Sequence, residues 1–143
     1  MRHINAAGLA IIKKAETCSL SAYLCPAGVP TIGWGSTRDV HLGMKITATE
    51  ADERLLSDLR DAEDDVNRLV KVALTDNQFS ALVSFVYNIG SGNFQKSGLL
   101  KKLNSGSYTS VPGELGKWTR GGGKKLLGLV IRRAAEGGLF LRL

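Results

Sequence analysis

The chain has 143 residues, a length that fits one domain able to bury a core without disulfide or metal support. Hydrophobic residues make up 43% of it and charged residues 22%, a balance that excludes an intrinsically disordered chain. No run reaches the roughly 18 apolar residues that a membrane-spanning helix needs. The formal net charge of +6 favours an anionic partner: cell-wall polymer, anionic membrane or nucleic acid.

The first stretch, "MRHINAAGLAIIKKAE", predicts a helix. Asn5 is placed to cap it, and Leu9, Ile12 and Ala15 follow at helical spacing. The apolar run is short, is interrupted by Gly8 and two lysines, and has no small-residue cleavage site, so it does not have the form of a signal peptide. We therefore expect the protein to remain in the cytoplasm in which it is made.

The hydrophobic pattern changes between Leu20 and Gly35. The turn formers of "PAGVP" separate two short runs of alternating character, which predicts a twisted β-hairpin, extended by "DVHLG". Pro30 confines the second strand to an edge position at its start.

Two capping boxes open the helices that follow. Thr47 with Glu50, and Thr75 with Gln78, have the spacing at which an N-cap hydroxyl and an N3 side chain satisfy each other's backbone N–H groups. The first of these helices is amphipathic, with mixed charges opposite an apolar side. That apolar side consists of Leu55, Leu56, Leu59, Val66 and Leu69. The second helix is apolar nearly all round and ends at Gly90, which predicts the central core helix.

The C-terminal third contains a short helix capped by Ser97, the glycine-rich loop "RGGGKK", and a basic amphipathic helix from Leu126 to Leu141. In that last helix Arg132, Arg133 and Glu136 have two interpretations. They form an internal ion-pair network, or they belong to a solvated helix face.

Together these elements predict an α+β fold in which a small N-terminal β-hairpin lobe is joined by a long helix to a helical C-terminal lobe. We expect a single domain over residues 1–143. The β lobe should occupy residues 17–46 and the helical lobe residues 71–143, with the helix at residues 1–16 packed on the latter.

The cysteines and histidines do not form a metal-binding pattern. Cys18 and Cys25 suit a reducing compartment better than a disulfide scaffold, and their spacing matches no zinc motif. The two histidines, His3 and His41, stand far apart in the sequence. We expect no metal and no cofactor.

Glu16 is the candidate general acid. It lies at the predicted C-terminal end of the first helix, where the negative end of the helix dipole and any burial both disfavour the charged form. A carboxyl group that keeps its proton near neutral pH is what a glycosidase uses to protonate a leaving oxygen. An exposed helix-end glutamate is the competing interpretation, and on position alone it is the better one.

Four further side chains are candidates for the same site. Thr31, on the returning strand, could orient a water through its hydroxyl, although threonine is also a good strand former. If "PAGVP" closes the hairpin, Cys25 faces Thr31 across the strands. Tyr23 and Asn88 are candidate substrate-binding residues, with core packing for Tyr23 and helix capping for Asn88 as the alternatives.

The combination resembles the phage-type lysozymes, the endolysins of glycoside hydrolase family 24. They show a glutamate ending the first helix, an "AYxDPxGxxTIGxGH"-like hairpin, and a catalytic Glu–Asp–Thr set in that order. Here "E-x8-C-x5-T" places Glu16, Cys25 and Thr31 in the same register, and "TIGWG" matches the glycine-bearing strand. "LTDNQFSALVSFVYNIGSGNFQKSGLLKKL" and "GGGKKLLGLVIRRAAE" resemble the family's core helix and C-terminal segment, so the resemblance covers nearly the whole chain.

The resemblance implies a bacteriolytic hydrolase of the β-1,4 bond between N-acetylmuramic acid and N-acetylglucosamine in peptidoglycan. In the family's scheme the glutamate protonates the leaving oxygen, while the aspartate and threonine position a water on the opposite face, with inversion. We expect a monomer that binds peptidoglycan and no nucleic acid, and that waits in the host cytoplasm until a holin opens the inner membrane. The basic C-terminal helix would add weak contact with anionic membrane.

Three positions depart from the family pattern. Cys25 stands where aspartate is most typical, Ser36 where a histidine often follows the glycine, and Thr17 where glycine is common after the glutamate. An ordinary thiol has a pKa near 8.5, so only about 3% is thiolate at pH 7. A nearby carboxylate would raise that pKa further, and a lysine or arginine would lower it.

The cysteine leaves several possibilities open. Cys25 could act as a nucleophile, or Glu16 could work with a water held by Thr31 alone. The chain is then an active lysozyme or, as the alternative, a catalytically impaired lysozyme-like protein that binds peptidoglycan without cutting it.

Overall fold

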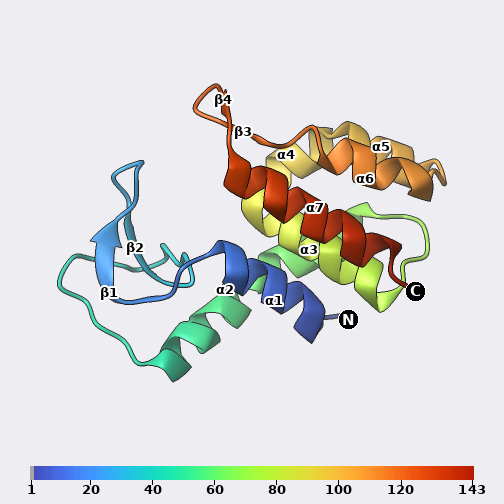
Figure 1. The fold of residues 1–143 in the computed structure, drawn as a ribbon. Helices are drawn as coiled ribbons and strands as arrows, with labels where there is room; N and C mark the ends of the chain where they lie inside the picture. The colour runs from blue at the N-terminus through green and yellow to red at the C-terminus, as the bar shows by residue number, and fades with distance from the viewer. Residues whose placement is uncertain (1) are drawn as a thin grey trace. The chain divides into compact units, whose positions relative to one another are not determined.

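The computed structural model describes residues 2–143, which form two compact units (Figure 1). The hairpin unit comprises residues 13–60, and the helical unit comprises the residues before 13 together with residues 61–143. Two helices, α1 (Ala6–Ala15) and α2 (Ala48–Leu69), run through the boundaries between them. Within residues 2–143 no helix is both long and apolar enough to cross a bilayer.

The hairpin unit is built on two antiparallel strands, β1 (Ser19–Leu24) and β2 (Pro30–Gly33). The register places Tyr23 opposite Thr31 and Leu24 opposite Pro30, with an irregularity between Ser19 and Tyr23. The intervening turn is closed by the backbone N–H of Cys25, which donates to the carbonyl of Val29 at 3.0 Å. Cys25 therefore lies in the turn and does not face Thr31 as a strand partner, which corrects the expected pairing.

The expected extension of the hairpin through "DVHLG" is wrong. That segment forms turns, and Asp39 has a φ of 53°. The chain instead returns to β1 directly after this segment, through Met44 and Ile46. The N–H of Ala22 donates to the carbonyl of Met44, and the N–H of Ile46 donates to the carbonyl of Leu20, both at 2.9 Å.

A small apolar core supports this unit. Ile32 on β2, Ile46 and Ala51 are buried together, and Cys18 and Trp34 pack against them as partly buried neighbours. The strand that carries Thr31 is thus held in place on one side by apolar packing. Truncation of any of these buried side chains would lower the free energy of unfolding.

Helix α2 begins with the expected capping box. The Thr47 hydroxyl accepts from the N–H of Glu50, and the Glu50 carboxylate accepts from the N–H of Thr47, both at 3.1 Å. Leu55, Leu59 and Val66 are buried as predicted. Leu56 does not belong to the buried side, since 51% of it is exposed.

The helical unit is centred on α3 (Asp76–Ile89), against which α7 (Leu127–Leu141) lies along most of its length (Figure 1). Thr75 and Gln78 form the capping box predicted for α3, and Gly90 ends it with a φ of 90°. The remaining elements are α4 (Ser91–Lys96), α5 (Gly98–Asn104), η1 (Tyr108–Ser110) and α6 (Val111–Leu115). The glycine-rich segment predicted as a loop carries a short hairpin, β3 (Arg120–Gly121) with β4 (Lys124–Lys125).

Helix α7 buries an ion-pair network against α3. Glu136 is fully buried and pairs with both Arg132 and Arg133, which are 4% and 3% exposed. Its Oε2 atom also accepts from the Ser84 hydroxyl at 2.6 Å, and Nε of Arg133 donates to the carbonyl of Trp118 at 3.0 Å. The internal-network interpretation is confirmed and the solvated-face interpretation is wrong, so these arginines give α7 no cationic surface.

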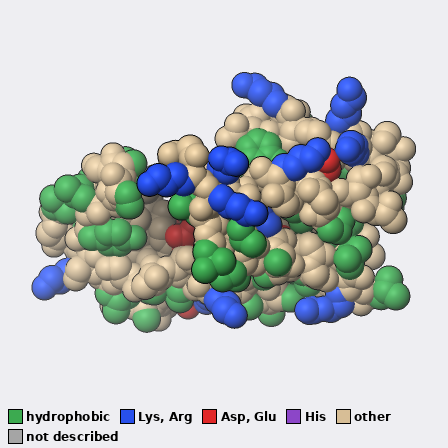
Figure 2. Space-filling view, turned by 45° about the horizontal axis from the view of Figure 1, so that its top comes forward, with side chains coloured by type: hydrophobic (Ala, Val, Ile, Leu, Met, Phe, Trp, Pro, Cys, Tyr) green, Lys and Arg blue, Asp and Glu red, His purple; other side chains and the backbone are tan. Residues whose placement is uncertain are grey.

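Charge is segregated along the chain. Residues 48–65 carry most of the acidic side chains, whereas residues 96–125 carry a single acid, Glu114. The cations of that second segment are Lys96, Lys101, Lys102, Lys117, Arg120, Lys124 and Lys125. Figure 2 shows Lys and Arg side chains gathered over the helical unit. This surface is suited to an anionic polymer.

Candidate functional site

Glu16 is the first residue after α1 and lies in the hairpin unit, half-buried. Its carboxyl group approaches the backbone of Gly35, in the turn that follows β2. A Cβ atom at Gly35 would lie 3.1 Å from Oε2 of Glu16, and the φ of Gly35 is +97°. Two properties of glycine, the missing side chain and the tolerance of positive φ, therefore allow this close approach.

Thr31 lies on β2 in the same unit, and only 4% of it is exposed. Its hydroxyl donates to the carbonyl of Val29 at 2.9 Å. Because that bond uses the one hydroxyl proton, the oxygen lone pairs remain as acceptors. Thr31 can thus accept a hydrogen bond from a water that it holds in place.

Cys25 is half-exposed in the hairpin turn. The backbone N–H groups of Val29 and then Ala27 hold the pKa of its thiol below the usual range. Partial burial opposes these hydrogen bonds without cancelling them. This lowering of the Cys25 pKa is opposite to the shift expected beside a carboxylate. Its cause is hydrogen bonding from backbone N–H groups and not a lysine or arginine. The thiolate is therefore more populated than in an ordinary cysteine.

The two predicted substrate-binding residues are placed in different units. Tyr23 pairs with Thr31 across the hairpin and is 40% exposed, so its ring is accessible beside the candidate catalytic residues. Asn88 lies near the end of α3 in the helical unit, where its side-chain oxygen accepts a hydrogen bond from Arg133. This contact ties Asn88 to the buried ion-pair network.

Three residues of the hairpin unit were missed by the sequence reasoning. The indole N–H of Trp34 donates to the Asp52 carboxylate at 2.9 Å, and Lys13 pairs with the same carboxylate at 3.2 Å. The Lys13 ammonium also lies 5.3 Å from the centroid of the Trp34 ring. The signal in the sequence was a tryptophan between two glycines, Gly33 and Gly35, but its partners lie on separate helices.

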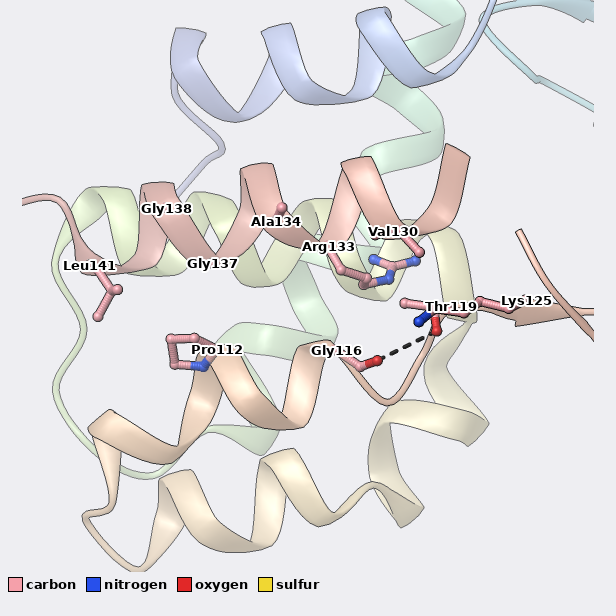
Figure 3. A pocket seen from close by; sticks show the side chains of 10 residues that line it. All are labelled: Pro112, Gly116, Thr119, Lys125, Val130, Arg133, Ala134, Gly137, Gly138 and Leu141. Atoms are coloured by element: carbon pink, nitrogen blue, oxygen red, sulfur yellow. Dashed lines mark hydrogen bonds between the residues drawn. The ribbon is translucent and has the colours of Figure 1, made fainter. Parts of the chain in front are cut away.

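A hollow in the helical unit does not contain this chemistry. It is a groove of about 360 Å³ between α6 and α7, kept open by small residues that include Gly116, Gly137 and Gly138 (Figure 3). Thr119 and Arg133 lie at one end of it, and Leu141 at the other. No lining residue is a carboxylic acid, and the Arg133 guanidinium is already bonded to Glu136. The groove therefore offers no acid–base pair for hydrolysis.

Residues 2–143 contain no group of three or more His, Cys, Asp or Glu side chains arranged to hold a metal ion, and both cysteines in this range are free thiols. The chemistry available at the hairpin is thus that of one carboxylic acid, one hydroxyl and one thiol. That set can protonate a leaving group and hold a water.

The chain is similar to known endolysins over nearly its whole length. An endolysin of Acyrthosiphon pisum secondary endosymbiont phage 1 is 42% identical over 142 residues, which are 96% of this chain and 97% of that protein. An endolysin of Bacillus phage PZA is 43% identical over 143 residues, 96% of this chain but only 54% of the relative, so the chain spans about half of that protein.

A solved structure shows the same fold over the whole length. The muramidase domain of SpmX from Asticaccaulis excentricus superposes with a TM-score of 0.93 at 38% identity, and each chain is covered completely. Residues 13–136 match the family described as phage lysozyme, a range that contains Glu16, Cys25 and Thr31. The chain belongs to the phage lysozyme family.

Proposed function

We propose that this chain is an endolysin that hydrolyses the β-1,4 bond between N-acetylmuramic acid and N-acetylglucosamine in peptidoglycan, and so lyses the host cell. Membership of the phage lysozyme family and the similarity to endolysins support this activity. The observation that carries it is the Glu16 carboxyl, held half-buried at the end of α1 against the Gly35 turn.

In this proposal Glu16 is the general acid and donates its proton to the glycosidic oxygen as the bond to the anomeric carbon breaks. A water bound to the Thr31 hydroxyl attacks that carbon from the opposite face, which inverts its configuration. The thiolate of Cys25 accepts the proton that the water loses. The depressed pKa of that thiol supports this role, because it keeps a base available beside the water.

The test of the acid is Glu16→Gln, which keeps the shape of the side chain and removes the transferable proton. We expect it to lower the rate of clearing of outer-membrane-permeabilised Gram-negative cells by about 10²–10⁴-fold. Glu53→Gln, the same change at an exposed position of the same unit, is the matched control. If Glu16→Gln clears the cells as fast as the parent, Glu16 is not the acid.

The second candidate function is wall binding without cleavage, and it rests on the thiol at position 25. A thiol is a weaker electrostatic substitute for a carboxylate, so Cys25→Asp should then create activity where the parent has none. Mass analysis of digested peptidoglycan decides the matter, since new reducing-end sugars from the parent protein remove this candidate.

We propose that a holin gives the protein access to the wall and that it acts as a monomer. Expression with and without a holin, and sedimentation of the purified protein, measure the two points. Contact of α7 with an anionic membrane would depend on the exposed Leu127 and Ile131, since Arg132 and Arg133 are buried. Leakage of anionic vesicles exposed to the Glu16→Gln protein measures that contact.

A further inference from the structure

Three side chains of the hairpin unit form a closed set of contacts outside the candidate catalytic residues. Trp34 donates its indole N–H to Asp52, Lys13 pairs with Asp52, and the Lys13 ammonium lies over the Trp34 ring. Each member belongs to a different element: Lys13 to α1, Trp34 to the turn after β2, and Asp52 to α2. We call these three residues the tryptophan latch.

Each contact in the latch reinforces the other two. The carboxylate accepts from the indole and attracts the ammonium, while the ammonium is held by the negative face of the ring. The indole N–H first, and Lys13 second, hold the pKa of Asp52 below its usual range, so the carboxylate stays ionised at neutral pH. The set therefore needs all three members to be in place.

The turn that carries Trp34 is tight. Ile32 and Ser36 exchange two backbone hydrogen bonds of 2.9 Å each, and between them Gly33 and Gly35 have φ values of +64° and +97°. Trp34 lies at the tip of this turn and directly precedes Gly35. A change in the position of the Trp34 side chain therefore also shifts the backbone of Gly35. The latch is also close to the candidate acid along the chain. Lys13 lies about one turn of helix before Glu16, with two residues between them.

The position of the Glu16 carboxyl depends on two segments that meet, and the latch contacts both of them. One is the last turn of α1, through Lys13, and the other is the Gly35 turn, through Trp34. We propose that Lys13, Trp34 and Asp52 are positioning residues that hold Glu16 in the geometry needed for proton transfer, without contacting the substrate. This inference rests on the proposed role of Glu16 as the acid.

A role in substrate binding is the rival explanation for Trp34, since aromatic rings stack on sugars. The two roles differ in their kinetics. Loss of a sugar contact that is equally strong in the ground state and the transition state raises KM and leaves kcat unchanged, whereas misplacement of the acid lowers kcat with little change in KM. Displacement by about 1 Å can lower a rate by up to about 10²-fold.

The test uses soluble glycan strands and the full chain. Lys13→Met removes the ion pair with Asp52 and the cation over the ring, Trp34→Phe removes the indole N–H bond to Asp52, and Lys13→Arg keeps the cation. We expect the first two to lower kcat about 10-fold with KM within about twofold of the parent, and Lys13→Arg to restore most of the rate. Lys14→Met removes the neighbouring cation, which makes none of the latch contacts, and should leave kcat unchanged. Thermal unfolding confirms that each variant is folded at the assay temperature.

A spectroscopic measurement tests the latch itself. In a Trp118→Phe background Trp34 is the one remaining tryptophan, because the chain has two. Since the folded-state pKa of Asp52 is lowered, the latch stays complete at neutral pH and is lost only in the acidic range, as the pH falls through that depressed pKa. We expect the Trp34 emission to change over that range, and Asp52→Asn to abolish the change.

The outcomes separate the inference from the proposed function. A raised KM with unchanged kcat in Trp34→Phe, or unchanged kinetics in both latch variants, overturns the positioning role while the parent remains an active lysozyme. An emission that does not respond to Asp52→Asn overturns it as well. A parent that yields no reducing ends overturns the proposed function and this inference together.

Discussion

Gly35→Ala is a sharp test of the geometry around Glu16. The added methyl group would stand 3.1 Å from Oε2 and 3.4 Å from Cδ of Glu16, closer than an ordinary van der Waals contact to the oxygen. The backbone at position 35 cannot easily relax to avoid this contact, because a φ of +97° is already a conformation that alanine rarely adopts. Either the carboxyl group or the turn must therefore move by a few tenths of an ångström.

Two effects of different size should follow. The strained φ costs about 1–2 kcal/mol of unfolding free energy, which corresponds to a fall in Tm of roughly 2–8 °C for a chain of this length. The displaced acid should lower kcat about 10–100-fold, because proton transfer depends steeply on the position of the donor. The rate loss is thus larger than a small drop in the folded population can explain.

Gly43→Ala is the matched control. Gly43 has a φ of +94° and lies in the same unit, but a Cβ there would meet nothing within 4 Å. It should show the same fall in Tm with kcat within about twofold of the parent. Rates on soluble glycan strands and thermal melts of the two variants are measured side by side. Equal kcat in Gly35→Ala and Gly43→Ala would refute the claim that Gly35 is required by the position of Glu16.

Two further predictions concern the thiol and the buried ion pairs. Because the pKa of Cys25 is lowered, its thiolate is lost only as the pH falls through that depressed value. The activity of Cys25→Asp should therefore exceed that of the parent by a larger factor at pH 6 than at pH 8. An activity ratio that does not vary with pH would count against thiolate as the base. Glu136→Ala leaves Arg132 and Arg133 buried without their carboxylate and should lower the free energy of unfolding by about 3–5 kcal/mol. Calorimetry should show a fall in Tm of roughly 10–15 °C. An unchanged Tm would show that the ion pairs are not needed for stability.

The features that the sequence predicted well depend on neighbours along the chain. The capping boxes at Thr47 and Thr75 need only two residues at a fixed spacing, and both are present in the structure. The cap at Ser97 is present for the same reason, with its hydroxyl accepting from the N–H of Leu100 at 3.1 Å. The α+β arrangement followed from the change of hydrophobic period after Glu16.

The features that were missed depend on contacts between distant segments. The hairpin register was shifted because Cys25 closes the turn with Val29, which leaves Tyr23 as the partner of Thr31. Nothing local distinguishes a buried arginine from a solvated one. Arg132 is buried against another helix, where the backbone carbonyl of Ser84 accepts its hydrogen bond at 3.0 Å. The latch was invisible for the same reason, since Asp52 lies far from Trp34 in the sequence.

The turn at Cys25 explains how a thiol can occupy a position where an aspartate is usual. A carboxylate would bring its own charge, whereas a thiol must be given one by its surroundings. The backbone N–H groups of Val29 and Ala27 do this, since they favour the anionic sulfur over the neutral one. Those groups belong to the turn and not to a particular side chain, so the hairpin backbone would stabilise an anion at position 25 in either case. Cys25→Asp should then need no other change to be accommodated, and a compensating mutation elsewhere in the hairpin should not raise its activity further.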